Sequence, residues 1–368
     1  MNINKVKNGM LLAVAGIWLA LSLTAWLRPA DDFSDTERRP LAQFPGWDAD
    51  SALDGSFMSD FETYTLDQFP LRNGFRQLKA MFHYRVLGQL DNNGIYLKDG
   101  FAAKLEYPLN TQSVDNAAAK FTSVYEKFLR DQGSRVYLAI VPDKSYYLAE
   151  AGGYPAMDYS ALTDQLREAM PFADYVNLSD CLSAEDYYRT DTHWRQENLL
   201  DAASRLCEAL DIPSPNAGDY TLRTAPVPFY GVYYGQAALP LEPDTLCWLE
   251  SDLLNGCRVM NYETGKYTGI YDEKKLSGKD LYEVFLSGPV SLLTMENPRA
   301  ETDRELIIFR DSFGSSIAPL LMQGYKTVTL IDIRYISRSM LDRFVDFHGQ
   351  DVLFLYSTLV LNNSETLQ

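Results

Sequence analysis

Basic residues, histidine and metal-binding motifs are all scarce in this 368-residue chain. Its 33 Lys and Arg stand against 50 Asp and Glu, and the net charge of -17 repels phosphate backbones, which argues against a nucleic-acid partner. With three histidines and no Cys-x-x-Cys pair, the chain also lacks the usual ligands of a zinc site. A metal site made from Asp191, His193 and Asp311 would have a single histidine, so we expect neither a metal nor another cofactor.

A long apolar run occupies residues 9–27. Its 19 residues, at about 1.5 Å each in a helix, nearly match a hydrocarbon core of about 30 Å and exceed the core of a cleaved signal peptide. Because Lys5 and Lys7 precede the run, we expect residues 1–29 to form a cytoplasmic tip and a signal-anchor helix, with the remaining chain outside the cell membrane. Small residues near the end of the run keep cleavage open as an alternative: Ala20, Ser22 and Ala25.

Four cysteines suit that oxidising compartment, because an even number permits disulfides. Three pairings are possible for four cysteines. We favour Cys181 with Cys207 and Cys247 with Cys257, since each pair closes a short loop and the first would brace the region of Asp191. Four free, buried thiols are the alternative.

A polar, turn-rich segment from residue 30 to about residue 70 predicts a stalk after the anchor. Apolar side chains at helical spacing extend over residues 55–87, and Pro70 divides them into two helices. His83 lies within this pattern, and we interpret it as an ordinary helix residue. The main folded domain is expected over residues 71–368.

Strands and helices alternate through most of the remaining chain. The apolar run Val136 to Val141 is typical of a strand buried on both faces of a parallel sheet. Three similar strands near the C-terminus are separated by helical segments, so their crossovers should be right-handed. The sequence therefore predicts an α/β fold with a mainly parallel sheet. The expected strands are 95–97, 136–141, 175–178, 306–309, 327–332 and 352–357, and the expected helices are 110–132, 159–170, 196–210, 315–323 and 339–347.

The character of the chain changes between about residues 213 and 298, where Pro and Gly are frequent and helical periodicity is lost. Short runs of Val, Tyr and Leu alternate with turns there, which predicts a β-rich insertion. The stretch 229–235 carries glycines that let the backbone approach a ligand, and Tyr230 and Tyr233 could line such a site. An aromatic hairpin in the core would explain the same residues equally well.

Two stretches suggest a catalytic site. Asp191 lies two positions before His193, and in an extended segment such residues project to the same side. A serine hydroxyl needs a histidine base of this kind, oriented by a carboxylate, to act as a nucleophile. Ser312 is the matching serine, because it follows the apolar run 306–309 where a strand turns into a helix. The alternative is that Asp311 and Ser312 simply cap that helix.

Residues near these stretches are candidates for substrate contacts. Lys144 follows the strand at 136–141, and the loops after such strands are where α/β sheets place ligands. Tyr188 and Trp194 flank the acid and the histidine, and we interpret them as supports or substrate walls. The 24 Tyr, 18 Phe and 5 Trp offer faces for stacking on sugars as well as for core packing.

The paired motifs resemble those of the DHHW family. They are Thr190-Asp191-Thr192-His193-Trp194 and Arg310-Asp311-Ser312-Phe313, with Arg38-Arg39-Pro40-Leu41 in the stalk. The family is related to the periplasmic alginate O-acetyltransferases, whose catalytic domain is similar to SGNH hydrolases. Thr192 stands where the Asp-His-His-Trp motif that names the family has its first histidine, and threonine at this position matches the alginate enzymes better. Arg310 stands where lysine is usual.

The resemblance implies a fold, roles and a partner. The fold is an SGNH-hydrolase-like three-layer sandwich, with Ser312 as nucleophile, His193 as general base and Asp191 as the acid that orients it. It also implies oxyanion donors from glycine and asparagine blocks, but no block can be assigned, and Asn362 and Asn363 after the last strand are candidates only. Because relatives work beside a multipass membrane protein that passes acetyl groups across the bilayer, such a partner is expected here.

We therefore expect a single-pass membrane protein whose extracytoplasmic domain transfers acetyl groups, through Ser312, to a hydroxyl of a cell-surface or secreted glycan. An acetylesterase of the same fold would perform the first step identically and release acetate. A membrane-anchored protein that binds or assembles glycan without catalysis is a third interpretation. The strong negative charge further suggests a neutral or cationic glycan rather than a polyuronate.

Overall fold

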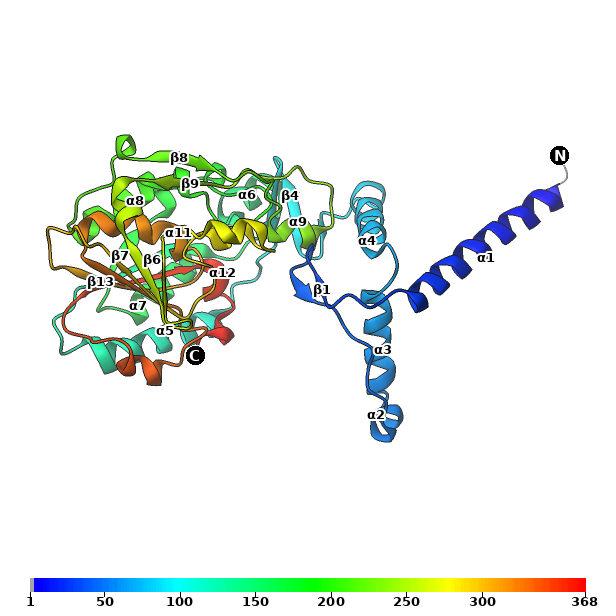
Figure 1. Cartoon of the computed structure of the whole chain (residues 1–368), viewed down its shortest axis with the longest axis horizontal. Coiled ribbons are helices and arrows are strands. Elements are labelled where there is room, and N and C mark those ends of the chain that lie inside the picture. Colours follow the sequence, from blue (N-terminus) through cyan, green and yellow to red (C-terminus); the bar gives the residue numbers. More distant parts are fainter. Residues whose placement is uncertain (1–2) are drawn as a thin grey trace. The chain divides into compact units, whose positions relative to one another are not determined.

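The chain forms two compact units in its computed structural model, which describes residues 3–368 (Figure 1). The first unit comprises Met1–Asn92 with Gly235–Pro240, and the second comprises Asn93–Tyr234 with Leu241–Gln368. The boundary falls later than residues 70 and 71, where the sequence suggested it, because the helix that follows Pro70 belongs to the first unit.

The N-terminal apolar run forms one helix. Helix α1 covers Ile3–Leu27, and its segment Val6–Leu27, 22 residues long, is long and apolar enough to cross a membrane. Such a helix suits a bilayer because it satisfies its backbone hydrogen bonds internally. The predicted apolar helix is therefore present, and its insertion in a membrane stays a prediction.

The segment expected to be a stalk is folded rather than extended. Strand β1 (Phe33–Ser34) pairs antiparallel with strand β2 (Arg39–Pro40). Arg39 donates two hydrogen bonds of 2.8 and 2.6 Å to Asp67, which hold the pKa of that carboxyl at about 2. The helices of this unit, divided at Pro70 as predicted, are α2 (Ala49–Asp54), α3 (Ser56–Asp67) and α4 (Arg72–Met81), which continues as a π-helix over Phe82–Val86.

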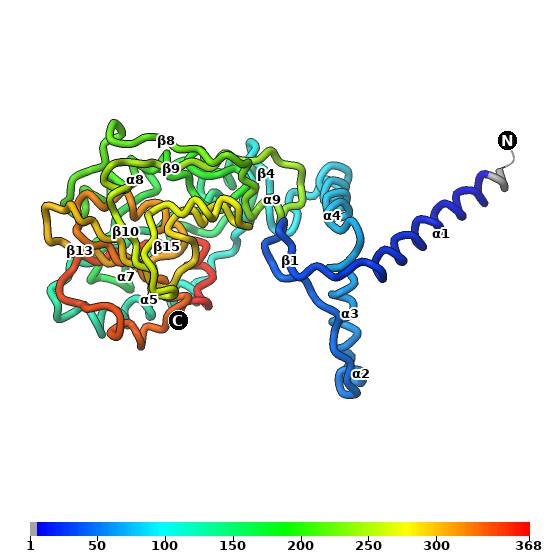
Figure 2. Tube along the Cα trace, viewed as in Figure 1, coloured from blue at the N-terminus to red at the C-terminus, as the bar shows by residue number. Residues whose placement is uncertain are grey.

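The second unit is built on an eight-stranded sheet with the strand order β11-β10-β12-β14-β13-β15-β6-β7. The last five strands of that order are parallel, and β12, β10 and β11 continue the sheet antiparallel. Strands from the C-terminal third thus lie beside strands from the middle of the chain (Figure 2). The parallel strands, each close to its predicted position, are β6 (Val136–Val141), β7 (Asp174–Asn177), β13 (Glu305–Arg310), β14 (Thr327–Ile331) and β15 (Asp351–Ser357).

Alternate residues of the central strands face two separate cores. In β13, the neighbours Ile307 and Ile308 pack into different apolar clusters, because successive side chains of a strand point to opposite faces. Helix α8 (Leu200–Leu210) covers one face, and α5 (Thr111–Val124) and α7 (Tyr159–Ala169) cover the other (Figure 1). The predicted three-layer α/β sandwich with a mainly parallel sheet is confirmed.

The predicted β-rich insertion at residues 213–298 is only partly separate from this sheet. Within it, β8 (Thr221–Thr224) pairs with β9 (Cys247–Glu250) alone. Three further strands instead extend the main sheet through the antiparallel pairing of β12 with β14: β10 (Arg258–Asn261), β11 (Lys266–Thr268) and β12 (Leu292–Glu296). The sequence of the insertion could not indicate this, because the pairing partner lies outside it.

Short elements connect these parts of the chain. The remaining strands are β3 (Asp91–Asn92), β4 (Ile95–Lys98) and β5 (Phe101–Lys104), and the remaining helices are α6 (Ser145–Gly152), α9 (Val232–Ala237), α10 (Asp252–Gly256), α11 (Gly314–Ile317) and α12 (Thr358–Leu361). The expected helices after residues 315 and 339 are mostly of the tighter 3-10 kind.

All four cysteines are free thiols, so both predicted disulfides are wrong. Cys207 and Cys257 belong to the core on one face of the sheet, and burial raises the pKa of the Cys207 thiol to about 12 and that of the Cys257 thiol to about 11. Cys181 and Cys247 are in hydrogen-bond contact with neighbours of their own. Cys207 and Cys257 therefore pack as small apolar groups.

Candidate active site

Ser312 lies directly after the central strand β13, at the carboxyl-terminal edge of the parallel sheet. The residue before it, Asp311, is fully buried. Its Oδ1 accepts a hydrogen bond of 3.0 Å from the N–H of Phe313, and its Oδ2 accepts one of 2.7 Å from the N–H of Ser357 at the end of β15. Asp311 thus ties the turn to the neighbouring strand, and Ser312 stays half-buried above it.

A tight loop over residues 188–193 carries the candidate base. Tyr187 and Trp194 close this loop as an isolated antiparallel bridge. The N–H of Tyr188 donates to the carbonyl of His193 at 3.0 Å, which narrows the loop further. The short acid and histidine motif is therefore presented on a closed loop, which we name the His193 loop, rather than on a strand or helix.

Trp194 joins the His193 loop to the turn that holds Ser312. The indole is fully buried, and its Nε1 donates to the hydroxyl of Ser316 at 2.8 Å and to the carbonyl of Phe313 at 3.2 Å. Both acceptors lie within four residues of Ser312, so the indole fixes one half of the site against the other. Trp194 is thus a support and not a substrate wall.

Asp191, His193 and Ser312 form a continuous hydrogen-bonded chain. Ser312 Oγ lies 2.8 Å from His193 Nε2, and His193 Nδ1 lies 2.6 Å from Asp191 Oδ1. Asp191 is fully buried while His193 keeps 8% of its surface exposed, so the acid is shielded from water and the base is not. Tyr282 stacks on the imidazole, with ring centroids 3.8 Å apart and planes at 7°. The structure brings together the three residues singled out in the sequence.

The stretch 229–235 holds the second oxygen of the aspartate. Asp191 Oδ2 accepts a hydrogen bond of 2.8 Å from the N–H of Val232. Gly231 permits this approach, because a Cβ at position 231 would lie 2.3 Å from the Cβ of Asp191. The glycine that was expected to admit a ligand therefore admits the aspartate.

Asp244 holds the backbone immediately before Asp191. Its carboxylate accepts hydrogen bonds from the N–H of Arg189 at 2.8 Å, and from the N–H and the hydroxyl of Thr190 at 2.7 and 2.6 Å. The carbonyl of Thr190 in turn accepts the N–H of Tyr233 at 2.9 Å. The His193 loop is therefore fixed by residues that are remote from it in sequence.

Lys144 is buried against the same loop instead of being exposed to substrate. Its Nζ donates to the carbonyls of Tyr188 and Arg189 at 2.8 and 3.3 Å, and lies 5.0 Å from the ring centroid of Tyr233. Burial lowers the pKa of this ammonium group to about 7 from its ordinary 10.5. Lys144 thus supports the His193 loop from within the fold.

The predicted aromatic contacts divide into supports and one exposed ring. Tyr188 is fully buried, and Tyr233 is buried with its hydroxyl 3.1 Å from the hydroxyl of Thr192. Tyr230 is 44% exposed. Of these three tyrosines, Tyr230 alone has a face that could meet a substrate.

Arg310 and Asn362 are structural residues. Arg310 is fully buried, and its guanidinium lies 3.7 Å from the carboxylate of Asp332. Asn362 and its neighbour Asn363 both donate through Nδ2 to Glu106, at 2.9 and 2.6 Å. Their second amide hydrogens point to backbone carbonyls at 3.2 and 2.9 Å, so neither side chain has a donor left for an oxyanion.

The sequence did not indicate three residues that contribute to the site, which are Asp244, Tyr282 and Val232. Asp244 is one of 50 acidic residues and Tyr282 one of 24 tyrosines, and no local pattern distinguishes either. Val232 acts through its backbone, which any residue could supply. The glycines at 231 and 235 were the one available signal.

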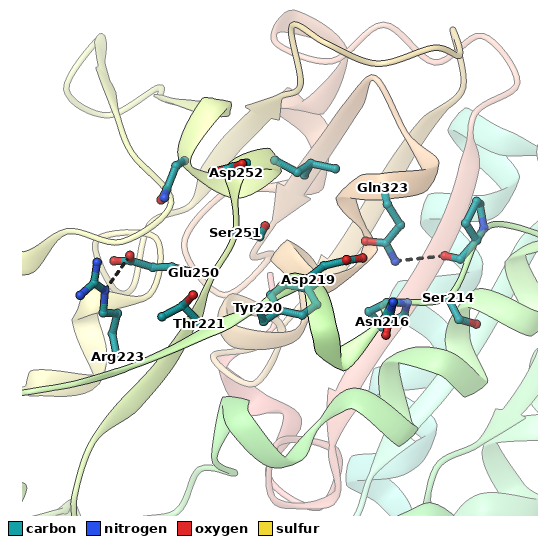
Figure 3. Close-up of a pocket in the computed structure, with 14 residues that line it drawn as sticks. Ser214, Asn216, Asp219, Tyr220, Thr221, Arg223, Glu250, Ser251, Asp252 and Gln323 are labelled. Carbon is teal, nitrogen blue, oxygen red and sulfur yellow. Dashed lines mark hydrogen bonds and ion pairs between the residues drawn. The ribbon is translucent and has the colours of Figure 1, made fainter.

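One surface cavity of the second unit, about 760 Å³, is lined by Asp219, Gln323 and neighbouring residues (Figure 3). Within it, Arg223 pairs with Glu250 at 2.8 Å. No residue of the hydrogen-bonded chain lines this cavity. Over the described residues 3–368, no three His, Cys, Asp or Glu side chains are grouped as metal ligands.

A second cavity, about 670 Å³, lies at the carboxyl-terminal ends of the neighbouring strands β6, β7 and β15, and like the first it is not lined by Asp191, His193 or Ser312. Pro142 and Thr358, which line it, follow β6 and β15, and Asn177 ends β7. The cavity is lined by the carboxylates of Glu150, Asp158 and Asp164 and by the rings of Tyr146, Tyr159 and Tyr175. No basic side chain lines it. We name it the edge cavity.

Comparison with known proteins finds similar structures but no match by sequence. No protein-family model matches the sequence, and no curated protein matches it either.

The structure is similar to a DHHW family protein from Eubacterium siraeum, with a TM-score of 0.62 and 22% identity over 75% of this chain and 95% of that one. PatB1 from Bacillus cereus with a sulfonyl adduct follows, with a TM-score of 0.58 and 17% identity over 73% of this chain and 95% of that one. A second structure of PatB1 has a TM-score of 0.56 and 16% identity over 73% and 96%. The relation to the DHHW proteins expected from the sequence is therefore one of fold, and this chain has the fold of that DHHW family protein and of PatB1.

Proposed function

We propose that this protein is a serine-dependent O-acetyltransferase that modifies a glycan outside the cell membrane. The observation that carries the proposal is the chain of hydrogen bonds from Asp191 through His193 to Ser312, with distances of 2.6 and 2.8 Å. This is the arrangement that activates a serine hydroxyl for acyl transfer. Its position at the carboxyl-terminal edge of a parallel sheet supports the same interpretation.

In the first step, Ser312 Oγ attacks the carbonyl carbon of an acetyl donor. Its proton passes to His193 Nε2, while Nδ1–H of the same ring donates to Asp191, which stabilises the imidazolium and keeps its orientation. The tetrahedral intermediate then collapses, and the histidine returns the proton to the leaving group. The product is an acetyl ester on Ser312.

In the second step, a sugar hydroxyl attacks this ester. His193 Nε2 takes the proton of the hydroxyl and then returns it to Ser312 Oγ as the bond between serine and acetyl breaks. Water at the same position would release acetate instead, which is the esterase reaction. The outcome therefore depends on whether an acceptor sugar displaces water.

The edge cavity is where we propose that the acceptor glycan binds. Tyrosine rings offer flat faces for sugars, and carboxylates accept hydrogen bonds from hydroxyl or ammonium groups. Because three carboxylates and no basic side chain line the cavity, the favoured acceptor is a neutral or amino-sugar glycan. Tyr230 remains a further candidate for substrate contact.

The membrane arrangement is part of the proposal. Helix α1 would anchor the chain with its catalytic unit on the extracytoplasmic side, and the acetyl donor would come from a multipass membrane protein. The apolar length of α1 and the two lysines near its N-terminal end, Lys5 and Lys7, support this topology.

Covalent labelling tests the nucleophile. A sulfonyl adduct has been seen in PatB1, and an activated serine of the same fold should react with phenylmethylsulfonyl fluoride. We expect mass mapping to find the label on Ser312 and to find none in Ser312→Ala, while the exposed-site control Ser277→Ala is labelled like the wild type. Label on another serine would overturn the site assignment.

An assay with p-nitrophenyl acetate as donor distinguishes transfer of the acetyl group to a sugar from its hydrolysis to acetate. We expect the wild type to place acetyl groups on an amino-sugar oligosaccharide, and Ser312→Ala to lose both transfer and release of p-nitrophenol. Release of acetate without any acetylated sugar would support the esterase instead. Unchanged acetylation of the cell-surface glycan by a folded Ser312→Ala would show that the protein acts without catalysis.

A further inference from the structure

Helix α4 and the π-helix after it present an unbroken apolar stripe to solvent. The stripe consists of Leu71, Phe75, Leu78, Phe82 and Val86, which are between 45 and 74% exposed. Leu71 immediately precedes α4, and spacings of three, four and four residues from Phe75 to Val86 place the other four on one side of the helix. Burying large apolar side chains is favourable, so a stripe of this size indicates a surface that something covers.

The opposite side of the helix is already packed within the first unit. Ala80 is fully buried. Arg72 and Arg76 both pair with Glu37, Arg76 at 3.2 Å. Because residues 72, 76 and 80 follow one another at helical spacing, these contacts fix the rotation of the helix and keep the stripe outward.

The chain that follows the candidate membrane helix is fastened beside this stripe. Asp31 lies four residues beyond Leu27, a stretch that spans at most about 14 Å. The N–H of Asp31 donates to the side chain of Gln68 at 2.9 Å, and Gln68 donates back to the carbonyl of Asp31 at 2.8 Å. Leu71 is three residues from Gln68, so the stripe begins close to the end of α1.

The charge of the segment complements an anionic lipid surface. Residues 71–86 contain four Arg or Lys and no Asp or Glu, although the whole chain carries a net charge of -17. Lys79 and Arg85 are exposed. A basic amphipathic helix next to an apolar span is the pattern of an element that lies in a membrane interface.

We propose that residues 71–86 lie on the outer surface of the membrane, with the apolar stripe inserted among the acyl chains and the side chains of Lys79 and Arg85 among phosphate groups of the lipids. This inference rests on the proposed anchoring by α1 and is independent of the chemistry at Ser312. The partner is the phospholipid bilayer, and the chain would thus have two membrane contacts, one spanning and one interfacial.

Photo-crosslinking of the full chain in proteoliposomes tests the contact. Leu78 in the stripe, and Asn73 as an exposed control on another side of α4, are replaced one at a time by p-benzoylphenylalanine. With vesicles of phosphatidylcholine and phosphatidylglycerol, we expect lipid adducts at position 78 to exceed those at position 73 about tenfold. Equal yields, or adducts at position 78 with protein instead of lipid, would overturn the proposal.

A double variant tests whether the basic side chains contribute to lipid contact. Lys79→Glu combined with Arg85→Glu should lower the lipid adducts at position 78 several-fold in anionic vesicles and less in pure phosphatidylcholine. Equal loss in both vesicles would contradict the electrostatic part. Resistance of the chain to carbonate extraction checks the α1 anchor separately, and circular dichroism checks that each variant is folded.

Discussion

Among single residues, Gly231 shows how closely the site depends on backbone approach. Its lack of a side chain lets the N–H of Val232 reach Asp191, and a Cβ there would lie 2.4 Å from the carbonyl oxygen of Thr190 as well. Such distances require atoms to move rather than merely to pack differently. The position of Asp191 therefore depends on a residue that has no side chain at all.

Gly231→Ala should displace Asp191 and slow acyl transfer. A misplacement of about 1 Å costs about 100-fold in rate, and we expect a loss of this order in kcat for release of p-nitrophenol. Gly269→Ala is the matched control, because its Cβ would meet its nearest atom at 3.8 Å. Full activity of Gly231→Ala would show that the contact with Asp191 is not needed.

Lys144→Met should change how stability depends on pH. The folded protein releases the Lys144 proton near pH 7, whereas the unfolded chain keeps it until about pH 10.5. Between these values the unfolded state binds more protons, so raising the pH favours the folded wild type through this group. The melting temperature of the wild type relative to Lys144→Met should therefore rise from pH 7 toward pH 10.

The same measurement on Lys266→Met, an exposed lysine, provides the control for Lys144→Met. A difference between wild type and Lys144→Met that stays constant over this range would mean that Lys144 holds its proton when folded. Activity gives a second measurement, since loss of the donor to the carbonyls of Tyr188 and Arg189 should also loosen the His193 loop.

At the scale of structural elements, the His193 loop is held from outside more than from within. One carboxylate, that of Asp244, accepts three of its hydrogen bonds, while Lys144 binds two of its carbonyls. The indole of Trp194 then fastens the end of the loop to the turn after β13. A loop fixed at several points keeps Asp191 and His193 in place without belonging to a regular element.

Asp244→Ala should loosen this loop. The N–H of Arg189 and the N–H and hydroxyl of Thr190 would lose their acceptor, at a cost of about 1–3 kcal/mol in the free energy of unfolding for each donor left buried without one. We expect faster amide hydrogen exchange at these two residues while strand β6 keeps its protection. Asp346→Ala, at a site whose side chain is 93% exposed, should change neither quantity.

At the scale of the whole molecule, the net charge of -17 bears on the choice of glycan. A negative field repels polyuronates and attracts amino sugars, and salt screens both effects. Binding of a chitosan oligosaccharide should therefore weaken as salt is added, whereas binding of an oligouronate of equal length should start weaker and strengthen. Tight, salt-insensitive binding of the oligouronate would contradict this prediction.

Much of the fold was predictable because its signals are local. The apolar runs at 136–141 and 306–309 indicate burial on both faces directly, and both are strands of the parallel sheet. The disulfides were not predictable in this way, since loop length says nothing about where two sulfur atoms point. The insertion was only half recognised, because β12 pairs with a strand that comes later in the chain.

The sequence by itself determined the apolar helix α1, the positions of the parallel strands along the chain and the choice of Asp191, His193 and Ser312 as candidates, since spacing and hydrophobicity are properties of neighbouring residues. Only the tertiary structure decided that His193 Nε2 lies 2.8 Å from a serine 119 residues later, and that Lys144 and Trp194 support the site rather than line it. Contacts between distant residues depend on how the whole chain packs, and no local pattern records them.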